Sequence, residues 1–177
     1  LAASVGGLAS GSSGSSQPAP TADAAPAPST ASDFDRAMME IATTYHTFPK
    51  IDHKAYMSTT GTFDINVYVH GDTQDYRTVH PDTTTMTPTI AVGTVIVREV
   101  LAADGTVSKL TLMAKGPSGY DPTFGDWWFG EADPQGMPLV VDGMIRLGRL
   151  DDCHSCHLPR APEDYIFGVP KEDQTSR

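Results

Sequence analysis

The sequence predicts an α+β fold: an antiparallel β-sheet with an N-terminal amphipathic helix and a C-terminal turn or helix that contains a C-x-x-C-H motif. Three observations predict it. Apolar residues recur at helical spacing soon after residue 32, and the period then changes to two over several segments. Turn-forming residues such as Asp104-Gly105 separate these segments, which is typical of hairpins in an antiparallel sheet.

The N-terminal helix is expected to begin after Ser32. Ser32 and Asp35 have the spacing of a capping box, in which two side chains satisfy free backbone N–H groups at the start of a helix. The helix should run until Pro49, because apolar residues share one face up to that point. These residues are Phe34, Met38, Ile41, Tyr45 and Phe48.

Four segments are expected to form strands. Residues 63–70 alternate between apolar and polar side chains, and residues 93–101 are rich in β-branched residues. The Asp104-Gly105 turn leads into residues 107–115, and residues 125–130 form the last strand. A short final helix should begin at Asp151 or Asp152 and end at Leu158, because Pro159 cannot continue it.

The chain divides into a tether and one domain. Residues 1–32 are mostly Ala, Ser, Gly and Pro, so they carry too little branched or aromatic surface to offset their chain entropy. We expect a flexible tether there, either a spacer or a tail without a partner. Its first ten residues are equally typical of a linker and of the end of a processed export signal. Residues 33–177 are expected to form a single domain of ordinary size.

The charge of the chain limits its partners. Twelve Lys and Arg against 22 Asp and Glu give a formal net charge of −10. Nucleic acid and anionic membranes are therefore not expected as partners, because binding phosphate requires clustered basic residues. A basic redox protein is compatible with this charge. No transmembrane segment is expected, because the apolar stretches are much shorter than the roughly 20 residues that cross a bilayer.

Both cysteines of the chain lie in Cys153-His154-Ser155-Cys156-His157. In the c-type haem motif each thiol adds to one haem vinyl group and the adjacent histidine binds the iron. Within one helical turn, two cysteines three residues apart face the same side. The motif therefore predicts one covalently attached haem c with His157 as the proximal ligand, and His154 as a bystander. Attachment of this kind implies assembly outside the cytoplasm, in the periplasm or on the outer surface.

Three other interpretations of the motif are weaker. A thioredoxin-like dithiol needs a βαβ setting, whereas here the motif follows a sheet. A plain disulfide gives no reason for His157. Zinc could use cysteine and histidine, but four ligands within five residues do not easily surround a tetrahedral ion, and no second cysteine pair exists.

Beyond this motif the chain resembles the cytochrome P-460 and cytochrome c′-β family. The similar stretches cover about residues 34–169 in the family's order; they are residues 93–99, 112–115, 125–129, 153–157 and 164–168. The resemblance implies a single haem in a mostly β pocket, where the sheet covers the distal side. Family members are often dimers, so a homodimer is one expectation. Cytochrome P-460 proteins carry a lysine bonded to the haem edge and oxidise hydroxylamine, whereas c′-β proteins lack that bond and bind small gases.

Two residues of the segment 107–115 are candidates for contact with the haem. Strand alternation places Met113 and Lys115 on one face together with Thr111. Lys115 is the candidate for the bond that the resemblance implies, although a lysine at a strand end is usually exposed. Met113 is a candidate sixth ligand, since a thioether raises the haem potential. Core packing is the alternative for Met113. Rival sixth ligands are Met137, Met144 and His70.

Two further residues are expected to contact the haem. Trp127, Trp128 and Phe129 must point to alternate sides of their strand, so Trp127 can pack against a haem plane or fill the core. Arg160 suits a haem propionate, because a guanidinium fork matches a carboxylate. An exposed arginine is the alternative there.

Three functions follow for an exported monohaem c-type cytochrome. The first is electron transfer to a redox partner protein, as a subunit of an extracytoplasmic assembly or alone. The second is binding of nitric oxide or carbon monoxide by a five-coordinate haem. The third is oxidation of hydroxylamine with a lysine-linked haem, so enzymatic activity is left open. The spin state of the iron separates the first two functions, and a covalent lysine identifies the third.

Overall fold

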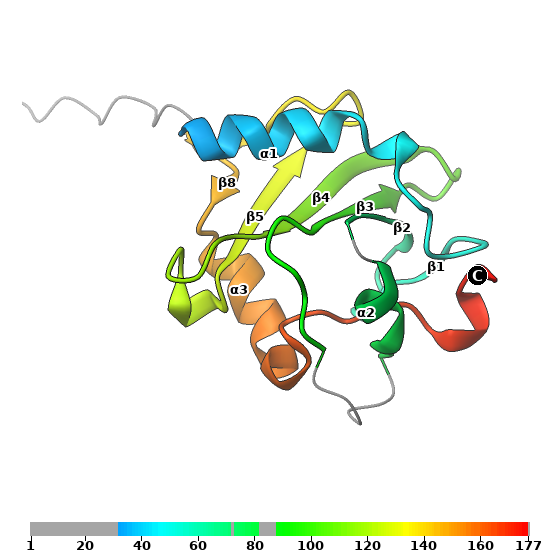
Figure 1. Ribbon diagram of the computed structural model, residues 1–177. Coiled ribbons are helices and arrows are strands. Elements are labelled where there is room, and N and C mark those ends of the chain that lie inside the picture. Colours follow the sequence, from blue (N-terminus) through cyan, green and yellow to red (C-terminus); the bar gives the residue numbers. More distant parts are fainter. Residues whose placement is uncertain (1–31, 72, 82–87, 177) are drawn as a thin grey trace, which may run out of the picture.

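The computed structural model describes residues 32–71, 73–81 and 88–176. It confirms an α+β fold built on an antiparallel sheet, with strand order β1-β2-β3-β4-β5-β8 (Figure 1). Apart from Ser32, the expected tether at residues 1–32 lies outside the described residues. The strands of the main sheet are β1 (Tyr56–Met57), β2 (Asp64–His70), β3 (Val95–Leu101), β4 (Val107–Lys115), β5 (Trp127–Ala132) and β8 (Leu147–Gly148).

Shorter elements surround this sheet. A second pair of strands consists of β6 (Val140–Val141) and β7 (Met144–Ile145). The α-helices are α1 (Asp33–Thr43), α2 (Thr73–Thr78) and α3 (Asp151–His157). Four 3-10 turns occur among the described residues, at Tyr45–Thr47, Pro122–Phe124, Leu158–Glu163 and Lys171–Asp173. No described helix has the length and apolar character needed to cross a membrane.

Helix α1 begins with a complete capping box. The backbone N–H of Asp35 donates to Ser32 Oγ, and the backbone N–H of Ser32 donates to the Asp35 carboxylate. The helix ends at Thr43, earlier than the apolar pattern indicated. The Thr43 and Thr44 hydroxyls donate to carbonyl oxygens one turn back, and a 3-10 turn then carries Tyr45 into the core. Such local side-chain bonds compete with continuation of a helix.

The long strands follow the predicted pattern. Strand β4 spans the predicted residues 107–115, and β3 and β4 form a hairpin with Val97 opposite Leu112. The turn between them closes at Ala102 and Thr106, and the Asp104 carboxylate accepts from the backbone N–H of Thr106. Gly105 adopts a φ of +82°, which a residue with a side chain rarely adopts. The predicted hairpin is therefore confirmed.

The sheet separates two apolar clusters, because neighbouring side chains of a strand point to opposite faces. Helix α1 covers one face, and α3 with the C-terminal segment lies on the other (Figure 1). The α1 side buries Leu112 and Trp128, and the α3 side buries Met113 and Phe129. The prediction that consecutive aromatic residues of β5 point to alternate sides is thus confirmed. The candidate site lies on the α3 side.

Candidate functional site

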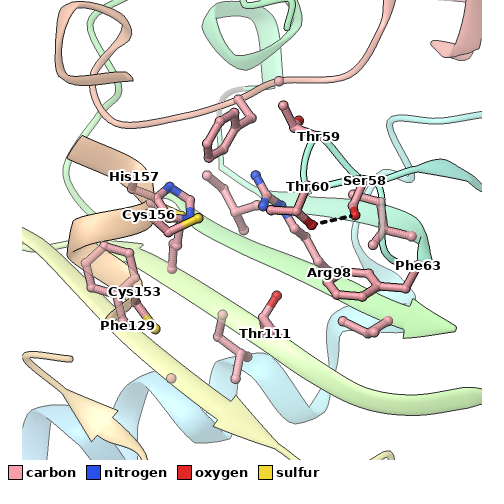
Figure 2. A pocket seen from close by; sticks show the side chains of 18 of the residues that line it. Ser58, Thr59, Thr60, Phe63, Arg98, Thr111, Phe129, Cys153, Cys156 and His157 are labelled. Carbon is pink, nitrogen blue, oxygen red and sulfur yellow. Dashed lines mark hydrogen bonds between the residues drawn. The ribbon is translucent and has the colours of Figure 1, made fainter. Parts of the chain in front are cut away.

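A pocket lies between the sheet and α3, and Figure 2 shows it from close by. Its empty space is about 970 Å³ with the open mouth included. The cavity without that open mouth has a volume of about 220 Å³, so a larger cofactor would extend out of the mouth. Most of its lining is apolar, with residues such as Phe63, Ile65, Ile96, Val100, Met113, Phe129 and Phe167.

Both cysteines of the motif and His157 line this pocket. They come from α3, where one helical turn brings Cys153 and Cys156 to the same side (Figure 2). Neither thiol is in a disulfide; Cys153 is half-buried and Cys156 is exposed. Burial, with the nearby charge of Asp152, raises the pKa of the Cys153 thiol to about 12. Redox-active dithiols instead depend on a lowered thiol pKa, so this environment does not favour thioredoxin-like chemistry.

The His157 ring is held in a single tautomer. Its Nδ1 lies 2.6 Å from the carbonyl oxygen of Tyr165, and since a carbonyl can only accept, Nδ1 carries the proton. The lone pair is then on Nε2. Burial and the charge of Arg98 lower the pKa of His157 to about 4, so the ring is neutral at pH 7. A histidine that ligates a metal has this arrangement, in which the second nitrogen donates to a carbonyl or carboxylate.

The carbonyl that fixes His157 belongs to a tightly held turn. Asp164 and Tyr165 both have left-handed backbone angles, with φ of 52° and 62°, which non-glycine residues rarely adopt. Lys115 Nζ donates to the Asp164 carboxylate at 2.6 Å, and Trp127 Nε1 donates to the Asp164 carbonyl at 2.9 Å. The Tyr165 ring packs so closely on Gly125 that a Cβ there would overlap it. These contacts position the Tyr165 carbonyl.

Lys115 and Trp127 therefore support the site from outside the pocket. Neither residue is part of the lining, although both lie on the predicted face of their strands. The Lys115 side chain is 15% exposed and forms an ion pair with Asp164. Through Asp164 and Tyr165, both residues act on the orientation of His157. The expectation that they contact the haem itself finds no counterpart in the pocket lining.

Arg160 is also placed away from the pocket lining. Its guanidinium donates to the carbonyl oxygens of His80, Pro81 and Ile166, and Nε lies 3.5 Å from the Glu163 carboxylate. The side chain therefore fastens the C-terminal segment to the residues after α2. Because its N–H groups already donate to these oxygens, Arg160 is not positioned to bind a propionate in the pocket.

Of the candidate sixth ligands, the pocket contains only Met113. Met113 is 5% exposed and belongs to the apolar cluster on the α3 side. Met137 and Met144 are each 65% exposed and lie outside the lining. His70 also lies outside it; it is exposed at the end of β2, and its ring is tilted against that of Phe48. His154, the expected bystander, stacks on Phe124 with ring centroids 3.6 Å apart.

Sequence reasoning missed the polar part of the pocket. Arg98 and Thr111 face each other across β3 and β4, and Ser58, Thr59 and Thr60 line the pocket from the loop after β1. The sequence indicated Arg98 only as a charged residue that directly follows the apolar residues 95–97. The hydroxyl groups carried no such signal, because loop residues are brought to a site only by the tertiary fold.

The residues of the pocket fit a covalently bound haem. Two free thiols, a neutral imidazole with a fixed tautomer and an apolar wall share one pocket. Among the described residues, no group of three or more His, Cys, Asp or Glu side chains could hold a metal ion by itself. In a haem the macrocycle supplies four of the iron ligands, so His157 suffices as the protein ligand. A scan against models of protein families finds no match, and a search of curated proteins finds none either.

Proposed function

We propose that the protein is an exported monohaem c-type cytochrome that resembles the cytochrome P-460 and cytochrome c′-β family and transfers electrons. The observation that carries the proposal is the hydrogen bond from His157 Nδ1 to the Tyr165 carbonyl, next to two free thiols in the same pocket. Cys153 and Cys156 would attach the haem, and His157 would ligate its iron. When bound, the haem supplies one-electron redox chemistry at iron.

Three features support electron transfer in particular. Cys156 is exposed, so the attachment side of the pocket reaches the protein surface, where a redox partner can approach. The net charge of −10 favours a partner with a basic surface, because complementary charges speed encounter. Met113 lines the pocket and could act as the sixth ligand. Attachment of haem c outside the cytoplasm implies a periplasmic or outer-surface location.

Binding of nitric oxide or carbon monoxide is the second candidate. It is favoured by the packing of Met113, which is 5% exposed within the apolar cluster of Ile96 and Phe129. If the thioether stays in that cluster, the side opposite His157 is left to a small apolar ligand. Phe63 then supplies an apolar cover of the kind that the c′-β proteins, which the chain resembles, carry.

Hydroxylamine oxidation has less support. No lysine is part of the pocket lining among the described residues, and the amine of Lys115 is engaged by Asp164 and by the carbonyl of Gly125. Arg98 is the cation that lines the pocket, and a guanidinium does not readily form the bond that a lysine amine forms. We therefore rank this function third.

Absorption spectra of the protein and of Met113→Leu, with and without carbon monoxide, test the role. For electron transfer we expect low-spin bands that carbon monoxide does not change, and a conversion to high-spin bands in Met113→Leu. High-spin bands in the unaltered protein that shift with carbon monoxide would contradict electron transfer and support gas binding. Met144→Leu, at an exposed position outside the pocket, is the control and should not change either spectrum.

A further inference from the structure

Arg98 is a half-buried cation with two buried, unpaired nitrogen atoms. It lies in the middle of β3 and lines the pocket, and its Nε and Nη2 atoms are buried without a hydrogen-bond partner among the described residues. The Phe167 ring lies 5.9 Å from the guanidinium carbon, and the Tyr76 hydroxyl is a second, neutral neighbour, whose burial-raised pKa the charge of Arg98 partly offsets. A guanidinium remains charged at physiological pH, and a buried charge without partners is costly. The side chain is therefore set to receive a negative group.

The two unpaired atoms define the shape of that group. Nε–H and the N–H of Nη2 lie on the same edge of a guanidinium, and this edge takes the two oxygens of a carboxylate side by side. Arg160 differs, because its Nε, Nη1 and Nη2 all donate to backbone carbonyls. Of these two arginines, only Arg98 offers a free bidentate edge.

Apart from Asp152, which adjoins Cys153 and pairs with Arg146, the charged and hydroxyl groups of the pocket lie away from the cysteines. Figure 2 shows Arg98 with Ser58 and Thr60 on one side of the pocket and Cys153, Cys156 and His157 on the other. The Ser58 and Thr60 hydroxyls hydrogen-bond each other at 3.0 Å. In a haem, the vinyl groups that react with cysteines and the two propionates lie at opposite edges of the macrocycle. The polarity of the pocket thus matches the polarity of the haem.

We propose that the bidentate edge of Arg98 binds a carboxylate inside the pocket, either a propionate of the haem or a small free carboxylate. Only the haem propionate depends on the proposed function; binding of a free carboxylate does not. It reassigns to Arg98 the role that the sequence indicated for Arg160, and it makes β3 the element that orients the polar edge of the bound group.

The test compares Arg98→Gln and Arg98→Lys with Arg36→Gln in the full chain. Arg36 pairs with Asp33 on α1, on the other side of the sheet, so its substitution removes one charge without touching the pocket. Circular dichroism melts show whether each variant folds. Resonance Raman spectra report the propionate bending bands, and titration with formate reports a free carboxylate.

If the carboxylate is a propionate, its bending band moves to lower frequency in both Arg98 variants and not in Arg36→Gln. The midpoint potential should fall in Arg98→Gln, because the lost cation disfavoured the ferric state, and should stay closer to the original value in Arg98→Lys. If the carboxylate is free, the protein binds formate saturably, and Arg98→Gln binds it about tenfold to a hundredfold more weakly. The proposal would be overturned if the propionate bending bands stayed unchanged in both Arg98 variants and if Arg98→Gln and Arg36→Gln bound formate equally.

The haem content is measured first, so that the two proposals fail separately. If the full chain carries no haem, the proposed function fails, and the Arg98 site is tested on the haem-free protein. There, saturable formate binding should shift the ¹⁵N resonance of Arg98 Nε. If formate leaves that resonance unmoved in the haem-free chain, the carboxylate site is refuted as well.

Discussion

The face of the sheet that carries α1 is closed by apolar side chains, whereas the opposite face keeps a pocket with a guanidinium, hydroxyl groups and an imidazole. The same strands build both faces. In β4, Leu112 packs in the cluster under α1 while its neighbour Met113 lines the pocket; in β5, Trp128 and Phe129 divide in the same way. Both faces therefore bury an apolar cluster, and the face that carries α3 also holds the candidate site.

Loss of the two thiols should have the largest effect on the pocket face, because it removes the groups that attach the haem. In the double variant Cys153→Ala/Cys156→Ala we expect no covalently attached haem, because no thiol remains to bond the vinyl groups. The measurement is the haem spectrum of the denatured protein, in which only attached haem remains. Ser155→Ala, an exposed position between the cysteines, is the matched control and should keep the haem.

The closed face should respond to truncation with a loss of stability alone. Trp128 is fully buried and its Nε1 donates to Asp35 of α1 at 2.6 Å. We expect Trp128→Ala to lower the free energy of unfolding by about 3–5 kcal/mol and to leave the haem spectrum unchanged. Urea unfolding and absorption spectra measure the two effects.

Phe129→Leu is the counterpart on the pocket face. The Phe129 ring lies 5.5 Å from the His157 ring, so this variant should change the spectrum of the bound haem at a smaller cost, about 1–2 kcal/mol. A spectrum that changes in Trp128→Ala and not in Phe129→Leu would reverse the assignment of the faces.

The haem-free protein should lose stability on acidification through His157. Its pKa of about 4 in the folded chain lies below the ordinary value of 6.5, so between these pH values the unfolded chain binds the extra proton. Stability therefore falls as pH drops from 6.5 to 4, by about 3 kcal/mol in total at about 1.4 kcal/mol per pKa unit. Urea unfolding across this range should show a smaller fall in His157→Gln. The exposed His53→Gln should behave like the original chain, and equal slopes in all three would refute the assignment.

Lys115→Met should produce a moderate loss of stability and a specific effect on the iron. Removing the partner of Asp164 should cost about 1–3 kcal/mol. A looser turn weakens the bond from His157 to the Tyr165 carbonyl, so the imidazole donates less charge and the midpoint potential rises. Lys109→Met is the control, because Lys109 lies on the same strand as Lys115 and pairs with Glu131 of β5 without contact to that turn. A potential that moves equally in both variants would exclude a positioning role.

Much of the fold was predictable because its long strands have a clear period. The segment 107–115 and its division into faces follow from alternation alone. Strands of two residues such as β1 and β8 carry too little pattern to be recognised. The end of α1 at Thr43 depends on hydrogen bonds from threonine hydroxyls, which compete with the helix in a way that apolar spacing does not reveal.

The site was predictable where its residues are contiguous in sequence. Cys153, Cys156 and His157 form one motif, and the structure places all three in one pocket. Arg98 and the loop hydroxyls reach that pocket only through the packing of β3 and the loop after β1 against α3. Lys115 was assigned to the correct face, but its position at the strand end brings it to Asp164 instead of the pocket.

The most direct test of the proposed c-type cytochrome is whether haem is covalently attached to the chain. The full chain is produced in a host with c-type haem maturation, extracted with acidic acetone and examined as the pyridine haemochrome together with its intact mass. We expect a haem c spectrum that stays with the protein and a mass increased by one haem. A colourless protein with the mass of the unmodified chain, or a haem that acetone removes, would contradict it.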